Sequence, residues 1–582
     1  MNIFDVLSLM GGLALFLFGM TVMGDALERR AGSKLKDLLG ALTKSRLKGF
    51  LTGLGVTAVI QSSSATTVMV VGFVNSGIMT LKQAIGVIMG ANVGTTVTAW
   101  ILSLGGISSD NIFMKLLKPS SFTPVLALIG IAFLMFGKSG KKKDTGTILL
   151  GFATLMFGMD TMSAAVKGLA DVPAFQQMFL MFKNPVLGVV VGALLTAIIQ
   201  SSSASVGILQ ALANTGQVTY AAAVPIIMGQ NIGTCITAIL SSFGTNKNAK
   251  RAAYVHLFFN IIGTCICLCV FVLISKIFKP VLLDQGAGYM GIAVAHSAFN
   301  VVCTAILLPM SGLLEKIAYL LVPETGKNEE VRELDERLIQ TPAIAISRCE
   351  DFTKEMARES FRGFSDGMDM LTAYNKDTAE SIRAQEDKCD HYEDILGTYL
   401  VKISKEQLTG NDSRQVTKLL KLIGDFERIS DHSVNVLESA EELKEKDILF
   451  SDDAKIELKT LIDATKEIME LSLNAFINNN LEAAGKVEPL EQVIDELKEH
   501  LRNGHILRLK NGECTIEAGF IWADILTDIE RVSDHCSNIA VCIIDTENKN
   551  LNVHESLRAI KKNSTEYLNL YAHYSDKYSF VK

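Results

Sequence analysis

Gln61-Ser62-Ser63-Ser64-Ala65 recurs as Gln200-Ser201-Ser202-Ser203-Ala204, 139 residues later in the chain. The repeat is longer than these tracts, because residues 53–99 align without a gap on residues 192–238 with 21 identities in 47 positions. A duplicated apolar unit with polar residues at its centre is typical of secondary transporters, which bind substrate between their halves. Serine-rich tracts can also serve helix packing alone, but packing does not require Gln and three serines twice in register. We therefore expect a binding site where the tracts meet.

The charge of the 582-residue chain divides it into two unlike parts. Residues 1–312 carry 21 Lys and Arg against 9 Asp and Glu, a net charge of +12, and consist mostly of long apolar runs. Residues 313–582 carry 34 against 53, a net charge of −19, and are helix-periodic and rich in Glu and Lys. The sequence therefore predicts an all-α protein with a membrane domain at 1–312, a linker at 313–346 and a soluble helical domain at 347–582.

Several apolar runs are long enough to cross a bilayer, which requires about 20 residues. They lie near 3–25, 80–104, 121–137, 145–166, 218–244, 252–275 and 287–311. Two further runs, 50–77 and 187–215, contain the QSSS tracts with many Gly, Ser and Thr, and we expect re-entrant hairpins there. Repeat 1 is expected at about 1–137 and repeat 2 at about 140–275, followed by an extra helix at 287–311.

Loop charges predict that the two repeats have opposite orientations. Segment 28–48 carries seven Lys and Arg, whereas its repeat counterpart 167–187 carries two. Positively charged loops tend to stay in the cytoplasm, so the first segment is predicted inside and the second outside. This layout gives inverted repeats and places the large C-terminal domain in the cytoplasm.

The polar residues expected at mid-membrane are hydroxyls and amides, which both donate and accept hydrogen bonds. Such groups could donate to phosphate or sulfate oxygens while their other oxygens coordinate Na⁺. Within the QSSS and Asn-containing segments the only basic residue is Lys82, near a segment end. Because a multivalent anion is costly to desolvate, we expect its binding to depend on helix N-termini and on cations bound with it.

Each QSSS tract is followed by a second motif, Met89-Gly-Ala-Asn92-Val-Gly-Thr95-Thr96 or Met228-Gly-Gln-Asn231-Ile-Gly-Thr234-Cys235. With these paired motifs, residues 1–312 resemble the bacterial form of the type II sodium–phosphate cotransporter family. The resemblance implies Na⁺-coupled transport of inorganic phosphate across the bacterial plasma (inner) membrane, with the serines and glutamines of the tracts at the substrate and sodium sites. On this basis we expect phosphate to contact Ser62, Ser63, Ser64, Ser201, Ser202, Ser203, Asn92 and Asn231. We expect Na⁺ to contact Gln61, Gln200, Thr95 and Thr234.

The soluble part contains a second duplication. Asp425-Phe-Glu-Arg-Ile-Ser-Asp-His-Ser-Val-Asn435 matches Asp528-Ile-Glu-Arg-Val-Ser-Asp-His-Cys-Ser-Asn538 at seven of eleven positions. Four Glu-x-x-x-Asp pairs occur in or near these motifs, and each places two carboxylates next to each other on one helix face. Such pairs repel each other unless a cation lies between them, so a multi-carboxylate metal site is one interpretation. A solvated charged face is the other.

Residues 347–545 resemble the PhoU family, two three-helix bundles that carry such motifs. That family is associated with phosphate signalling and with iron- or zinc-type metal clusters. The resemblance implies a divalent or ferric cluster, of unspecified metal, and a cytosolic phosphate-signalling protein as partner. The carboxylates concerned are Glu386, Asp390, Glu427, Asp431, Glu491, Asp495, Glu530 and Asp534.

These observations favour a Na⁺/phosphate transporter with a cytosolic regulatory domain, whose partners are inorganic phosphate, Na⁺ and the lipid bilayer. One alternative is a membrane-anchored regulator or scaffold that transports little; another is a transporter that exports phosphate. An enzyme is not expected, because the sequence has no P-loop, nucleophile elbow or paired catalytic His and Cys. We expect no nucleic-acid partner.

Overall fold

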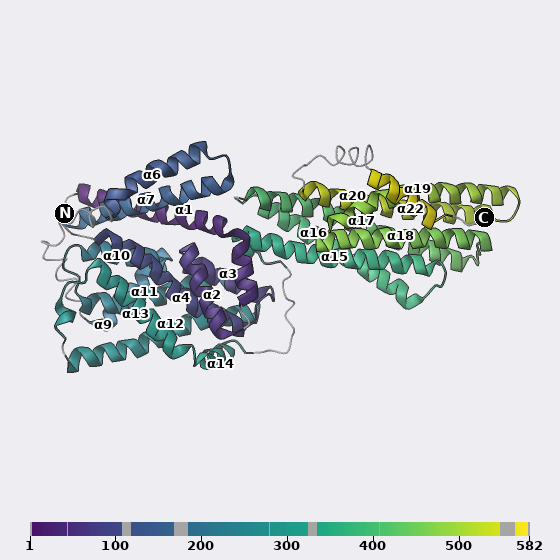
Figure 1. Ribbon diagram of the computed structural model, residues 1–582. Coiled ribbons are helices and arrows are strands. Elements are labelled where there is room, and N and C mark those ends of the chain that lie inside the picture. The colour runs from purple at the N-terminus through teal and green to yellow at the C-terminus, as the bar shows by residue number, and fades with distance from the viewer. Residues whose placement is uncertain are drawn as a thin grey trace. The chain divides into compact units, whose positions relative to one another are not determined.

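The computed structural model describes residues 3–42, 45–106, 118–167, 184–278, 280–323, 334–406, 408–547 and 565–579. Within these ranges the regular structure is helical, apart from one isolated β-bridge between Thr219 and Gly286. The chain forms two compact units, Met1–Ile344 and Ala345–Lys582, and Figure 1 shows each of them as a helical body. The all-α fold predicted from the sequence is confirmed.

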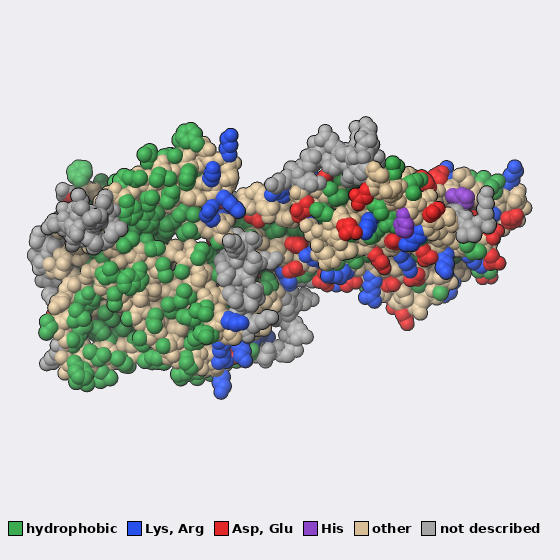
Figure 2. All heavy atoms as spheres, in the orientation of Figure 1, with side chains coloured by type: hydrophobic (Ala, Val, Ile, Leu, Met, Phe, Trp, Pro, Cys, Tyr) green, Lys and Arg blue, Asp and Glu red, His purple; other side chains and the backbone are tan. Residues whose placement is uncertain are grey.

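In the described part of the N-terminal unit, seven helices are long and apolar enough to cross a membrane, as predicted. Figure 2 shows apolar side chains spread over the surface of this unit, and Phe136, for example, is 78% exposed. Such an apolar exterior suits lipid better than water. The seven helices are α1 (Ile3–Leu42), α4 (Leu81–Ser103), α6 (Pro119–Phe136), α7 (Gly140–Val166), α11 (Tyr220–Ser241), α12 (Lys247–Ile277) and α13 (Tyr289–Leu307). The short helices η1 (Leu104–Gly106) and η3 (Val281–Asp284) follow α4 and α12.

Two helical hairpins lie between these spans, as predicted. The first consists of α2 (Arg46–Ile60) and α3 (Ser63–Asn75), and the second of α9 (Pro185–Ile199) and α10 (Ser202–Ala213). Even a helix of 15 residues is only about 22 Å long at 1.5 Å per residue, shorter than a bilayer core of about 30 Å. Each hairpin breaks at the Gln of its tract, because Gln61 and Gln200 have left-handed φ angles of 63° and 59°.

The same close backbone packing joins each hairpin to the following span in both repeats. A Cβ on Gly90 of α4 would lie 2.0 Å from the Phe50 carbonyl oxygen of α2. At the equivalent place, a Cβ on Gly229 of α11 would lie 2.0 Å from the Val189 carbonyl oxygen of α9. No real side chain fits at that distance, so these positions require glycine. The duplicated sequence therefore specifies a duplicated backbone arrangement.

Helices α1 and α7, which are equivalent in the two repeats, pack against each other in antiparallel register. A Cβ on Gly12 would lie 3.0 Å from the Gly158 carbonyl oxygen, and one on Gly19 would lie 2.7 Å from that of Gly151. As the residue number rises from 12 to 19 along α1, the number of the facing residue falls from 158 to 151 along α7. Small residues allow membrane helices to approach this closely. Inverted repeats require this antiparallel relation.

Segment 313–346, expected as a linker, contains helical structure: most of α14 (Ser311–Leu321) and all of η4 (Glu336–Gln340). The α14 helix packs against α12, where the Arg251 guanidinium lies 4.0 Å from the centre of the Tyr319 ring. The η4 helix packs against α3. Charge composition did not reveal these elements because both are short and follow the end of the last apolar run.

At each end of the N-terminal unit, hydrogen bonds join segments that are distant in sequence. At one end, Asn75 of α3 donates to the buried Asp335 carboxylate at 2.7 Å and accepts from the Asn246 backbone N–H at 2.8 Å. At the other end, the Tyr220 N–H donates to the Gln285 carbonyl oxygen at 3.1 Å. The first end is the one predicted to face the cytoplasm, and the chain passes from it into the C-terminal unit.

The C-terminal unit consists of two three-helix bundles, as predicted. Helices α15 (Pro342–Met370), α16 (Lys376–Ser404) and α17 (Gly410–Glu445) form the first bundle, in which Phe352 of α15 packs on Tyr392 of α16 and Phe361 on Phe426 of α17. The second is formed by α18 (Asp452–Asn478), α19 (Leu481–Lys510) and α20 (Ile516–Glu547), with α22 (Thr565–Lys577) packed on α19. The α17 helix of the first bundle packs against α20 of the second, and fully buried residues such as Phe364, Phe426 and Trp522 fill the cores of the bundles.

Candidate functional site

Two helix N-termini, one from each repeat, form the centre of the candidate site. Ser62 caps α3, because its hydroxyl oxygen accepts from the Ala65 N–H at 3.2 Å. Ser201 caps α10 in the same way, at 3.3 Å from the Ala204 N–H. One cap leaves the other N–H groups of the first turn without a partner in the helix. Those groups and the helix dipole make each N-terminus favourable for an anion.

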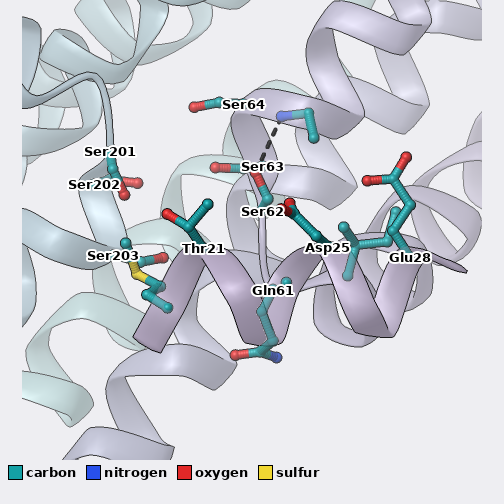
Figure 3. A pocket seen from close by; sticks show the side chains of 14 residues that line it. Thr21, Asp25, Glu28, Gln61, Ser62, Ser63, Ser64, Ser201, Ser202 and Ser203 are labelled. Atoms are coloured by element: carbon teal, nitrogen blue, oxygen red, sulfur yellow. Dashed lines mark hydrogen bonds between the residues drawn. The ribbon is translucent and has the colours of Figure 1, made fainter. Parts of the chain in front are cut away.

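The two QSSS tracts line one cavity of about 210 Å³, shown in Figure 3. All six serines that were expected to contact phosphate lie around it, together with Gln61. The Ser64 hydroxyl donates to the Gln200 carbonyl oxygen at 3.3 Å, which ties the tracts together although they are far apart in sequence. The fold thus brings two distant tracts to one cavity.

Two of these serines offer unused hydroxyls to the cavity. Ser63 and Ser202 are only 7% and 5% exposed. The Ser63 carbonyl accepts a hydrogen bond from the Thr67 hydroxyl. Neither the Ser63 hydroxyl nor the Ser202 hydroxyl has a hydrogen-bond partner among the described residues. Neither hydroxyl oxygen is among the fully buried atoms that lack a partner, so both are accessible from the cavity. A ligand in the cavity would therefore gain from bonding to both.

The glutamines of the two tracts differ in their environments. Gln61 is buried, and its side-chain oxygen accepts a hydrogen bond from Thr98 of α4 at 2.9 Å. Gln200 is exposed and does not line the cavity. Its backbone carbonyl accepts a hydrogen bond from Ser64, which does line the cavity. The two expected Na⁺ ligands are therefore equivalent in sequence and backbone but not in side-chain placement.

The other four expected site residues do not line the cavity. Each is buried in α4 or α11 and donates a hydrogen bond to a carbonyl one turn earlier in its own helix. The bonds run from Asn92 to Ile88 and from Asn231 to Ile227, both at 3.0 Å, and from Thr95 to Ala91 and from Thr234 to Gln230, also at 3.0 Å. A ligand role for these four residues stays a prediction.

The sequence analysis missed a polar stripe on α1. Thr21, Asp25 and Glu28 line the cavity opposite the serines, at the spacing that places side chains on one helix face. The signal was present in this spacing, but the apolar run of the first helix ends near residue 25, whereas α1 itself continues to Leu42. Two carboxylates therefore lie at a cavity that was expected to contain hydroxyls and amides.

The N-terminal region of the chain matches the family described as Na⁺/Pi-cotransporter over residues 15–164 and again over 155–293. The chain belongs to the Na⁺/Pi-cotransporter family. The two matches overlap at residues 155–164, and each contains one of the two hairpins with its QSSS tract. The C-terminal unit of this Na⁺/Pi-cotransporter family member matches the PhoU domain twice, over residues 353–440 and 458–543, once in each bundle.

Three relatives show how far the similarity extends. The chain is 23% identical over 556 residues to the Escherichia coli (strain K12) "Putative inorganic phosphate export protein YjbB", covering 93% of this chain and 97% of that one. It is 31% identical over 316 residues to the "Uncharacterized protein YqeW" of Bacillus subtilis (strain 168), covering 53% and 95%. It is 38% identical over 131 residues to the human "Sodium-dependent phosphate transport protein 2B", covering 21% and 19%. Phosphate transport is the activity that these comparisons support.

In the PhoU domains of this family member, the expected metal-binding carboxylates approach one another in pairs. Glu427 and Asp431 share a hydrogen bond, and burial followed by the nearby Asp431 charge raises the pKa of Glu427 to about 7. Burial and neighbouring carboxylates, including Asp431 and Asp390, also raise the pKa of Glu386. A cation would relieve this repulsion between the carboxylates of the first bundle.

In the second bundle, one of the expected carboxylates is already paired with a lysine. Burial and the neighbouring Glu530 charge raise the pKa of Asp534, whose surroundings include Asp495. Glu530, however, already forms an ion pair with Lys498 at 2.8 Å. Among the residues that the structure describes, no group of three or more His, Cys, Asp or Glu lies where it could hold a metal ion. The metal cluster, including the share expected from Glu491, stays a prediction.

The sequence analysis also missed two His–Asp pairs, in each of which a histidine of one PhoU domain contacts an aspartate of the other; we call this the His–Asp exchange. His432 Nδ1 lies 2.8 Å from Asp528 Oδ1, and His535 Nδ1 lies 2.9 Å from Asp425 Oδ1. The two imidazole rings are 6.1 Å apart. These residues occupy equivalent positions in the duplicated motif, so each motif pairs its histidine with the aspartate of the other. The duplication was visible in the sequence, but the exchange of partners was not.

Proposed function

We propose that this protein carries inorganic phosphate across the bacterial plasma membrane together with Na⁺, binding both in the cavity between the repeats. One observation carries the proposal: the N-termini of α3 and α10, from separate repeats, meet with their serines at a single cavity. Backbone N–H groups and hydroxyls at such a place can surround a tetrahedral oxyanion. The family and the phosphate-related names of its relatives agree with this ligand.

The charges around the cavity support cation coupling. Its lining contains no Lys or Arg among the described residues, and it contains the carboxylates of Asp25 and Glu28. A phosphate dianion in such a place would be repelled by the carboxylates and would lose its hydration. Na⁺ bound with it would offset both effects. The favourable state is then the one in which anion and cation enter together.

Export of phosphate is a second candidate, favoured by the similarity along nearly the whole chain to the relative named as a phosphate export protein. The cavity reaches Glu28, whose side chain hydrogen-bonds Thr341 near the C-terminal end of the N-terminal unit. We place this end of the membrane domain in the cytoplasm, together with the PhoU domains. The PhoU domains would then sense phosphate on the side from which export begins. In both directions the PhoU domains would act as regulators, with a phosphate-signalling protein as partner.

Flux of ³²P-labelled phosphate in proteoliposomes tests the proposal. Purified full-length protein would be reconstituted, and uptake and efflux would be measured with a Na⁺ gradient in either direction and with K⁺ in its place. We expect saturable phosphate flux that a Na⁺ gradient accelerates and K⁺ does not. Phosphate flux that is equal with Na⁺ and K⁺ would contradict Na⁺ coupling, and the absence of any flux would contradict transport.

A further inference from the structure

The acidic stripe of α1 has no equivalent in the second repeat. At the repeat offset of 139 residues, Thr21, Asp25 and Glu28 correspond to Asp160, Ala164 and Lys167. The serines are therefore duplicated around the cavity, whereas the carboxylates are contributed by one repeat alone. A feature that the duplication does not explain requires its own reason.

Asp25 is the carboxylate of the stripe that remains available to a ligand. Glu28 is hydrogen-bonded by the Thr341 side chain. The neighbouring Arg29 is directed to Asp144, with Nε at 3.2 Å from the carboxylate. No ion pair or hydrogen bond joins the Asp25 carboxylate to a described residue, although the charge of Arg29 acts on it. Figure 3 shows Thr21 and Asp25 on the part of α1 that faces the serines.

The surroundings of Asp25 supply the other oxygens that a small hard cation requires. Thr21 lies one turn earlier on the same face of α1. Ile60, the last residue of α2, also lines the cavity, and helix C-termini present carbonyl oxygens with partial negative charge. The α1 helix comes close to this helix end at Gly24, where a Cβ would lie at an ordinary van der Waals distance of 3.5 Å from the Ile60 carbonyl oxygen.

A second and independent feature points to a ligand in the same space. Ser63 and Ser202 are more than nine-tenths buried and line the cavity, and their hydroxyls lack partners among the described residues. They lie at the helix N-termini, which favour an anion, while Asp25 and the end of α2 favour a cation. The cavity thus has a positive side and a negative side.

We propose that Asp25 binds the Na⁺ ion that accompanies phosphate, and that this single carboxylate makes Na⁺ obligatory for phosphate binding. Thr21 and the C-terminal end of α2 complete the cation side of the cavity. With Na⁺ absent, the Asp25 charge repels phosphate from the serines. With Na⁺ bound, the same charge is neutralised and the cation attracts the anion. This inference rests on the proposed function and assigns its coupling to one residue.

The test uses the full-length protein and the variants Asp25→Asn, Asp25→Glu and Asp160→Asn. Asp160→Asn is the matched control, since it makes the same carboxyl-to-amide change at the position equivalent to Thr21, outside the cavity lining. Gel filtration and thermal melting establish that each variant is folded. The first readout is ²²Na⁺ binding to purified protein without phosphate; the second is the Na⁺ dependence of ³²P-phosphate exchange in proteoliposomes.

We expect Asp25→Asn to lose at least tenfold in ²²Na⁺ affinity, the lower end of the range for an interaction with a charged group. Phosphate exchange in this variant should continue but need at least tenfold more Na⁺ or become independent of it. Asp25→Glu should restore part of the affinity, and Asp160→Asn should resemble the unchanged protein. Unaltered ²²Na⁺ binding and Na⁺ dependence in folded Asp25→Asn would overturn the proposal.

Two other outcomes separate this inference from the proposed function. If Asp25→Asn removes the pH dependence of exchange but leaves the Na⁺ dependence intact, Asp25 serves a proton and the Na⁺ assignment is wrong. If the unchanged protein exchanges no phosphate, the proposed function fails, while the ²²Na⁺ measurement still decides whether Asp25 binds the cation.

Discussion

The hydroxyl of Thr98 donates a hydrogen bond to the side-chain oxygen of Gln61 over 2.9 Å. It also accepts one from the Ser203 hydroxyl at 3.4 Å, so a single residue of α4 contacts both QSSS tracts. Its counterpart in α11, Thr237, instead donates to the Thr234 carbonyl of its own helix at 2.9 Å. The two repeats have the same backbone at this point, but only the first repeat joins the two tracts through this residue.

Replacing Thr98 with valine should weaken phosphate binding, because it removes the hydroxyl that holds Gln61 and Ser203 and changes the shape little. A neutral hydrogen bond contributes about 0.5–1.5 kcal/mol, so the phosphate Kd should rise roughly twofold to tenfold. Thr237→Val is the matched control and should change the Kd less. Isothermal titration of phosphate into protein in Na⁺ buffer measures both. Equal effects of the two variants would contradict the asymmetric role of Thr98.

Replacing either Ser63 or Ser202 with alanine should impair the same phosphate flux, since both hydroxyls face one cavity. A lost hydrogen bond to a charged ligand costs about 1.5–3 kcal/mol, which corresponds to a roughly tenfold to hundredfold loss of affinity. Ser275→Ala is a suitable control, because this serine of α12 bonds the Val272 carbonyl at 2.9 Å. Normal Na⁺-dependent uptake in Ser202→Ala, with expression verified, would show that the second tract serves packing alone.

The sequence could predict the parts of the site that depend on local structure. A serine directly before a helix caps it, and the repeated QSSS tract therefore predicted two broken helices whose ends meet. The partners of Asn92 and Asn231 could not be predicted, because an amide in a helix can bond its own backbone or a ligand. Asp25 was missed because its place depends on how α1 packs beside the two hairpins. The exchange between His432 and Asp528 depends on the packing of one bundle against the other.

Single cysteines should reveal opposite exposure of the two ends of the N-terminal unit. Lys142 lies at the start of α7 on the end predicted to be cytoplasmic, and Val281, which is 76% exposed, lies at the other end. In a background without the ten native cysteines, Lys142→Cys should react with an impermeant maleimide only after the membrane is opened. Val281→Cys should react in intact cells. Labelling of both from one side would contradict the inverted-repeat topology.

The exchanged His–Asp pairs should hold the two PhoU domains together. The side chains of His432 and Asp528 are only 19% and 11% exposed, so their hydrogen bond is protected from water. A double-mutant cycle with His432→Gln and Asp528→Asn should give a coupling energy of about 0.5–3 kcal/mol in denaturant unfolding. The exposed pair between Lys466 and Asp369, at 2.7 Å, is the control and should give about 0–1 kcal/mol. Coupling no larger than in the control would show that the exchange does not stabilise the unit.

The raised pKa of Glu427 predicts how the stability of the C-terminal unit changes with pH. Because this pKa is about 7 in the folded protein and 4.5 for an ordinary glutamate, the folded state binds the proton more tightly. The contribution of Glu427 is therefore fully present below about pH 4.5 and is lost as the pH rises through 7. In EDTA, the Tm of residues 345–582 should fall between pH 5 and pH 8, and Glu427→Gln should reduce this fall. Glu530→Gln is the control, since Lys498 already neutralises that carboxylate at 2.8 Å.

A metal ion at Glu427 and Asp431 would reverse this trend, because it replaces the proton that the pair otherwise needs. Added Mn²⁺, Zn²⁺ or Fe³⁺ should then raise the Tm more at pH 8, where the proton has left, than at pH 5. Glu427→Gln should weaken the effect by removing one ligand. Elemental analysis of the purified unit provides the complementary measurement. If it finds no metal, and none of the three ions shifts the Tm at either pH, the paired carboxylates form a charged face that is stabilised by protonation alone.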